Sequence, residues 1–178
     1  MFNRRGTLAV ACLGTAMLML DVAVVNTALP RIAGQLHSGL VGLQWIIDAY
    51  ALTLATVVLT VGSLADRFGR RRVFAAGTVI FTAASLACAL AGSITALDAA
   101  RAVQGLGAAM LFATSLALIA DAFPDKDGRA GAFAAYGATI GASFALGPLV
   151  GGCLTSTLGW RSRLSVPSTA WMAGWRRP

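Results

Sequence analysis

Five long apolar stretches, joined by short polar connections, constrain the fold of this chain more than any other feature. They cover residues 7–29, 44–64, 73–92, 94–120 and 130–158. A helix needs roughly 20 apolar residues to cross a bilayer, and a helix satisfies its own backbone hydrogen bonds where no water can. Charged residues make up only 12% of the sequence, whereas about a quarter is usual in soluble domains. The sequence therefore predicts an all-α polytopic membrane protein with about five transmembrane helices.

Basic residues gather in the connections and not along a polar face. One side of the membrane receives most of them: Arg4, Arg5, Arg67, Arg70, Arg71, Arg72, Lys126 and Arg129. The other side receives only Arg31 before the tail. Because cytoplasmic loops carry the excess of arginine and lysine, we expect a cytoplasmic N-terminus. The net charge of +7 is then a matter of membrane orientation, and the lipid bilayer, not nucleic acid, is the expected partner.

Two charged side chains lie deep in the predicted helices. Asp21 is roughly 13 Å from the outer end of the first helix, and Arg101 is roughly 10 Å from the outer end of the fourth, at 1.5 Å per residue. The two could therefore share one layer of the bundle, with Gln104 one turn below Arg101. Charges inside a membrane usually mark proton or ion pathways. The alternatives are a structural anchor at Asp21 and an arginine that extends to the interface.

The connection between the second and third helices, predicted at 65–72, carries more than orientation requires. The connection and the helix end before it combine glycines, a carboxylate and arginines: Gly62, Asp66, Arg67, Gly69, Arg70 and Arg71. This pattern is typical of a tight turn in which charged groups hold neighbouring helix ends. A plain cytoplasmic anchor is the alternative.

The fifth helix contains a Pro and Gly cluster made of Gly147, Pro148, Gly151 and Gly152. Proline removes a backbone hydrogen bond, and the glycines allow close helix contact. The cluster indicates a kink or packing surface that moves during transport, or else a static kink.

Catalysis and metal binding find no support in the sequence. Cys12, Cys88 and Cys153 lie in apolar stretches without metal-ligand spacing. His37 is the only histidine, and no nucleophile and base can be assembled around it. We expect no enzyme, no metal site and no bound cofactor.

Four segments together resemble the major facilitator superfamily, and more narrowly its drug:proton antiporters with fourteen predicted spans. They are LDVAVVNTALP at 20–30, GSLADRFGRRR at 62–72, RAVQGLGAA at 101–109 and GPLVGG at 147–152. Gln44-Trp45 and Ala49-Tyr50 are similar to the usual start of helix two in that family. Ser143 departs from it, because a glycine usually begins the helix-five motif.

The resemblance implies alternating access between two six-helix halves, with the substrate site between them. It implies export of small amphiphilic, often cationic, compounds from a bacterial cell across the inner membrane, driven by the proton gradient. Asp21, Arg101 and Gln104 would then belong to the proton relay. Asp66 and the neighbouring arginines would latch the cytoplasmic gate.

The length departs from the family. Residues 1–160 correspond to a partial N-terminal half, and residues 161–178 contain arginine and proline with no spanning stretch. We expect a truncated or frameshifted product that is inactive alone. The alternative is a small integral membrane protein that acts only by packing with a partner.

Overall fold

A computed structural model of the chain describes residues 4–36 and 39–157, with side chains up to residue 149. The described residues form five α-helices. These are α1 (Arg4–Leu36), α2 (Leu40–Phe68), α3 (Arg70–Leu90), α4 (Ile94–Ala122) and α5 (Lys126–Thr157). All five are long and apolar enough to cross a membrane. The all-α fold predicted from the apolar stretches is confirmed, while the tail at 161–178 and His37 lie outside the described residues.

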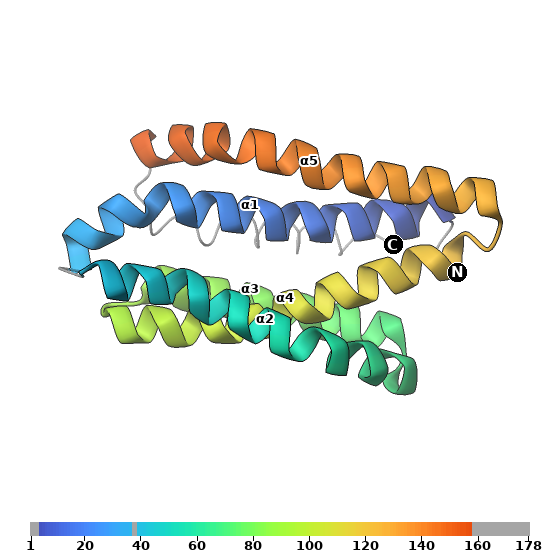
Figure 1. The fold of residues 1–178 in the computed structure, drawn as a ribbon, viewed down its shortest axis with the longest axis horizontal. Helices are drawn as coiled ribbons and strands as arrows, with labels where there is room; N and C mark the ends of the chain where they lie inside the picture. Colours follow the sequence, from blue (N-terminus) through green and yellow to red (C-terminus); the bar gives the residue numbers. More distant parts are fainter. Residues whose placement is uncertain (1–3, 37–38, 158–178) are drawn as a thin grey trace.

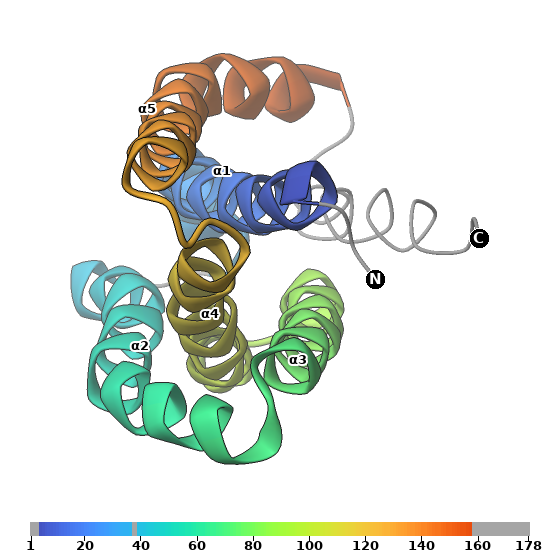
Figure 2. The ribbon, with the colours of Figure 1, turned by 90° about the vertical axis from the view of Figure 1, so that its right-hand side faces the viewer.

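The helices run side by side along one long axis (Figure 1). Seen end-on, α4 has α2 and α3 on its flanks and α1 on a third side, and α5 packs against α1 (Figure 2). The apolar core accordingly lies around α4 and α1. A cluster that includes Val25, Ile32, Ile46 and Leu97 joins α1, α2 and α4 toward one end.

Glycines explain why α3 approaches α4 so closely. A Cβ atom at Gly107 would lie 2.6 Å from the backbone nitrogen of Phe81, and one at Gly77 would lie 2.7 Å from the Cβ of Met110. Real side chains do not approach that closely, so both positions require the absence of a Cβ. Small residues permit such backbone contact in membranes, where apolar burial from water does not drive helix association.

The first helix does not end at Pro30, as its apolar stretch had suggested, but continues to Leu36. Proline costs a helix one backbone hydrogen bond. Packing of the following turn offsets that cost here, because Ile32 is buried in the core and Leu36 packs against the same cluster. The predicted stop at residue 29 is therefore wrong.

The turn between α2 and α3 is also tighter than predicted. The two helices are separated by the single residue Gly69, whose φ of 94° lies in a region that favours glycine. Asp66 and Arg67 consequently lie in the last turn of α2, and Arg70 and Arg71 lie in the first turn of α3. The loop expected at 65–72 is a reversal at one residue.

Candidate functional site

A buried polar network occupies the interior of the bundle between α1 and α4. Arg101 Nη1 lies 2.7 Å from Asp21 Oδ2, and Gln104 Nε2 donates to Asp21 Oδ1 at 2.8 Å. Asp21 and Arg101 are each 2% exposed, and Gln104 is completely buried. The structure thus brings together Asp21 and Arg101, which the sequence had placed in one layer, and Gln104, which it had placed one turn below Arg101. Arg101 does not extend to the interface.

Gln104 forms hydrogen bonds with both charged residues of this network. Its Oε1 accepts from Arg101 Nη1 at 2.8 Å, while its Nε2 donates to Asp21 and, at 3.3 Å, to Ser85 Oγ. The thiol of Cys88 also points to Gln104 Oε1, at 3.6 Å. Burying a charge is costly unless it is paired and hydrogen-bonded. The amide therefore helps to hold a carboxylate and a guanidinium in an apolar bundle.

Helix α2 contributes two contacts to Arg101 that sequence reasoning missed. Arg101 Nε donates to the carbonyl of Ile46 at 3.2 Å, and the guanidinium lies over the ring of Tyr50 with 4.3 Å between Cζ and the ring centroid. No periodicity could have identified Tyr50, because its role depends on which face of α2 meets α4. Through these contacts the network involves α1, α2, α3 and α4.

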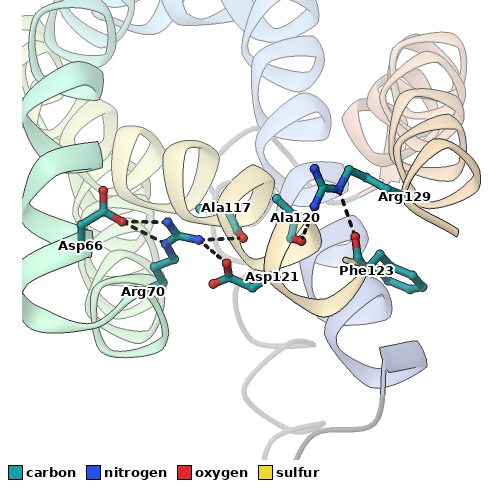
Figure 3. Close-up of polar contacts among 7 residues, drawn as sticks. All are labelled: Asp66, Arg70, Ala117, Ala120, Asp121, Phe123 and Arg129. Atoms are coloured by element: carbon teal, nitrogen blue, oxygen red, sulfur yellow. Dashed lines mark hydrogen bonds and ion pairs between the residues drawn. The ribbon is translucent and has the colours of Figure 1, made fainter. Parts of the chain in front are cut away.

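A second polar cluster lies at the end of α4 that approaches the turn at Gly69, and Figure 3 shows its contacts. Arg70 Nη2 lies 2.9 Å from Asp66 Oδ1, and Arg70 Nη1 lies 2.6 Å from Asp121 Oδ1. Arg70 also donates to the carbonyl of Ala117 at 3.1 Å. One arginine of α3 therefore links the ends of α2 and α4. The sequence had predicted such a link between helix ends, but it had not identified Asp121 as a partner.

Arg129 approaches the same end of α4 from the other side (Figure 3). Its Nε donates to the carbonyl of Phe123 at 3.0 Å, and its Nη2 donates to that of Ala120 at 3.5 Å. The last carbonyls of a helix lack intrahelical partners and carry negative partial charge. Two arginines, Arg70 from α3 and Arg129 from α5, thus satisfy carbonyls in the final turns of α4.

The start of α1 is tied to the connection between α4 and α5 at this same end. Arg4 Nη1 lies 3.0 Å from Asp125 Oδ1, and the backbone N–H of Gly128 donates to Asp125 Oδ2 at 3.0 Å. Backbone N–H groups, chiefly that of Asp125 itself and then that of Gly128, hold the pKa of the Asp125 carboxyl below its ordinary value. The carboxylate therefore stays ionised, ready to pair with Arg4, at neutral pH.

The remaining residues of the predicted turn motif have varied surroundings. Arg67 is exposed and Gly62 is half-buried. Arg71 and Arg72 line a cavity of about 780 Å³ together with Arg4, Arg70, Asp66 and Asp121. The charged motif thus borders a water-accessible hollow at the end of the bundle, and only Arg70 joins three helices through the contacts described above.

The predicted helix-five cluster lies inside an unbroken helix. Gly147 is buried where α5 crosses α1, and a Cβ there would collide with Ala23, two residues after Asp21. Pro148 is exposed, and Gly151 and Gly152 follow it within α5. The close-packing part of the prediction thus has a structural basis at Gly147, whereas its movement remains a prediction.

Comparisons with known proteins agree with this architecture. The family model described as Major Facilitator Superfamily matches residues 11–167. The chain is 43% identical over 156 residues to the multidrug resistance protein Stp of Mycobacterium tuberculosis, covering 88% of this chain and 29% of Stp. It is 41% identical over 155 residues to the methylenomycin A resistance protein of Bacillus subtilis, covering 87% of this chain and 33% of that protein.

A solved structure resembles the fold at low sequence identity. It is a bacterial homologue of the human lysosomal transporter Spinster, in an inward-facing, unoccupied conformation. The TM-score is 0.81 at 20% identity, and the match covers 93% of this chain and 40% of that one. The chain spans about a third of the length of the curated relatives it matches. On the family model and these relatives, this multi-pass membrane protein belongs to the Major Facilitator Superfamily.

Proposed function

We propose that this chain forms part of a proton-coupled multidrug exporter in a bacterial inner membrane, with its N-terminus in the cytoplasm. The observation that carries the proposal is the buried contact of 2.7 Å between Asp21 and Arg101, completed by Gln104. Ionisable groups inside a membrane bundle are costly and usually serve ion or proton movement. The names of the relatives, which refer to multidrug and antibiotic resistance, support export of drugs.

Proton coupling would act through the charge of Asp21. As a carboxylate, it accepts hydrogen bonds from Arg101 and Gln104. A proton on either oxygen removes the ion pair and leaves the Arg101 charge without its counter-ion. The contact between α1 and α4 is then weakened, because attraction between opposite charges is strong in a low-dielectric interior. We propose that the proton gradient uses this change, with no bound cofactor.

The cytoplasmic gate would depend on the cluster at Gly69. Arg70 holds Asp66 and Asp121 together at the ends of α2 and α4. We assign the latch to six residues of this turn and the helix end before it: Gly62, Asp66, Arg67, Gly69, Arg70 and Arg71. Movement of α5 against α1 would be centred on Gly147 and Pro148, followed by Gly151 and Gly152.

Transport, and not catalysis, is the activity that this arrangement supports. The substrates would be small amphiphilic or cationic compounds, held between two halves of the complete transporter. We therefore propose that the 178-residue chain exports nothing alone. Apolar residues exposed on α2 and α5, such as Leu52, Leu59 and Phe144, would face either lipid or another protein. The second candidate is accordingly a small membrane protein that acts by packing with a partner.

A chimera tests the proposal. The matched segment of the Stp protein is replaced by this chain, and ethidium efflux is measured in vesicles with and without an imposed pH gradient. We expect efflux that depends on the gradient, and Asp21→Asn should reduce it to the level of vesicles without the protein, because the amide cannot exchange a proton. Asp127→Asn, which changes an exposed acid on α5, is the matched control.

Two results would contradict the proposal. Gradient-driven efflux that survives Asp21→Asn would remove Asp21 from proton coupling. Gradient-driven ethidium export by the 178-residue chain alone, reconstituted in liposomes, would overturn the requirement for a second half.

A further inference from the structure

Tyr50 lies next to the polar network, and the resemblance of its segment to the usual start of helix two assigns it no role. It lies on α2 and is 6% exposed, and its ring faces the guanidinium of Arg101 at 4.3 Å. The other contacts of that guanidinium run to Asp21, Gln104 and the carbonyl of Ile46. Of these contacts, the ring face is the one that holds the cation without accepting a hydrogen bond.

A small pocket reaches this pair from the seam between α1 and α2. Its volume is about 140 Å³, and it is lined by Val22, Val25, Asn26, Ile47, Ala51, Tyr50 and Arg101. Asp21 and Gln104 are not among the lining residues. Tyr50 and Arg101 are therefore the residues of this lining that also take part in the contacts of the buried network.

Gly105 explains how α2 comes close enough to place the ring. A Cβ at Gly105 would lie 2.5 Å from the carbonyl oxygen of Tyr50 and 3.1 Å from the Cβ of Thr53. The glycine thus allows the backbone of α2 to contact α4 one turn beyond Arg101. The ring position is consequently a result of helix packing and not of a flexible surface side chain.

We propose that Tyr50 is a positioning residue, which holds Arg101 against Asp21 and closes the pocket between α1 and α2 off from the carboxylate. This inference rests on the proposed function, because it assumes that Asp21 exchanges a proton. When Asp21 is protonated, the ion pair is lost but the attraction between the ring and the guanidinium remains. Arg101 is therefore still in place when the proton leaves.

The other ionisable groups around Asp21 are few. Arg101 faces it from α4, Tyr50 lies beside Arg101 on α2, and Cys88 reaches the network from α3. On α5, the residues 130–149 hold one ionisable side chain, Tyr136, and it bonds to Thr15. Asp48 and Asp98 lie on the same helices as Tyr50 and Arg101, and both are left unchanged in the variants below.

The test measures protonation of Asp21 directly in the purified 178-residue chain in lipid nanodiscs. Dicyclohexylcarbodiimide modifies protonated carboxyl groups in apolar surroundings, and peptide mass spectrometry gives the modified fraction of Asp21 at each pH. In Tyr50→Leu, which keeps an apolar side chain but removes the ring, we expect half-maximal labelling about one pH unit higher, a tenfold change in proton affinity. The reason is that a displaced or hydrated guanidinium favours the carboxylate less.

Two further variants separate positioning from general damage. Tyr50→Phe keeps the ring and should retain the native labelling profile. Tyr136→Leu removes another buried tyrosine from a different helix pair, and it should leave the profile unchanged even if the chain becomes less stable.

The outcomes distinguish this inference from the proposed function. A native profile in Tyr50→Leu, with Asp21 still labelled in a pH-dependent way, overturns the role of Tyr50 alone. Labelling of Asp21 that does not vary with pH in the native chain overturns both. A shift in Tyr50→Phe equal to that in Tyr50→Leu also overturns the inference, since it would assign the effect to the hydroxyl group.

Discussion

At the scale of single residues, Gln104 decides whether the buried charges are tolerated. A carboxylate and a guanidinium alone would leave several donors and acceptors unpaired in the bundle. Gln104 supplies both a donor to Asp21 and an acceptor to Arg101. Unsatisfied buried polar groups cost about 1–3 kcal/mol each, so this one amide lowers the cost of placing the pair in the interior.

The pair itself allows a stability prediction. Asp21→Leu should lower the free energy of unfolding by about 3–5 kcal/mol, because it leaves Arg101 as a buried charge without a counter-ion. The double variant Asp21→Leu with Arg101→Met should recover much of that loss. Denaturant unfolding of the chain in detergent, followed by circular dichroism, measures both values.

Asp127→Leu serves as the control for this comparison. The residue is an exposed acid in the first turn of α5, and its replacement should change the stability by less than about 0.5 kcal/mol. A double variant that is less stable than Asp21→Leu alone would contradict the assignment of the cost to an unpaired charge.

Some features of the buried network could be predicted from the sequence, and others could not. The depth of Asp21 and Arg101 follows from helix rise, so their common level could be predicted. The partners Tyr50, Ser85 and Asp121 could not be predicted, because the rotation of each helix about its axis decides which side chains meet. The contacts of Arg129 with the end of α4 could not be predicted either, because they depend on where the first turn of α5 lies relative to α4.

At the scale of elements, α4 is the helix around which the bundle is built. It contacts α1, α2 and α3, and its two close neighbours approach at glycines. Gly105 admits the backbone of α2, and Gly107 admits that of α3. Helix association in lipid depends on such packing, so these two glycines determine how closely α2 and α3 approach α4.

Replacing one of these glycines should separate the helices. Gly107→Ala should destabilise the chain by about 1–3 kcal/mol, because the new methyl group meets the backbone of Phe81 and overpacks the contact. Gly137→Ala, on α5, is the matched control. Nothing lies within 4 Å of a Cβ at that position, and alanine gains up to about 1 kcal/mol of helix propensity.

Thermal unfolding of both variants in the same detergent measures the difference. Equal stability of Gly107→Ala and Gly137→Ala would contradict close backbone packing between α3 and α4. The bounds of the elements were harder to predict from the sequence. Helix α1 passes Pro30 because Ile32 is buried in the core and Leu36 packs against the same cluster, and apolar runs do not report such packing.

At the scale of the whole molecule, charge is distributed unequally between the two ends of the bundle. The end near Gly69 carries Arg4, Arg70, Arg71 and Arg72 around one cavity, together with Asp66 and Asp121. The positive-inside bias therefore predicts that this end faces the cytoplasm. Near the opposite end, where α1 ends and α2 begins, Arg31 is the one basic residue among those that the structure describes.

Labelling in intact cells tests this orientation. With a membrane-impermeant maleimide, we expect Gly34→Cys to react and Arg5→Cys to react only after the cells are opened. Both sites are exposed at opposite ends of α1, so they differ only in the side of the membrane that they face. Labelling of Arg5→Cys in intact cells would reverse the orientation.

Hydropathy alone settled the number of spanning helices and the presence of charges at one depth. Both are local properties, because the cost of crossing lipid depends on about 20 consecutive residues. The contacts themselves were decided by tertiary packing, in which glycines on α4 set the distance and rotation of α2 and α3. For that reason the five apolar stretches could be read from the chain, whereas the placement of Tyr50 on Arg101 required the assembled bundle.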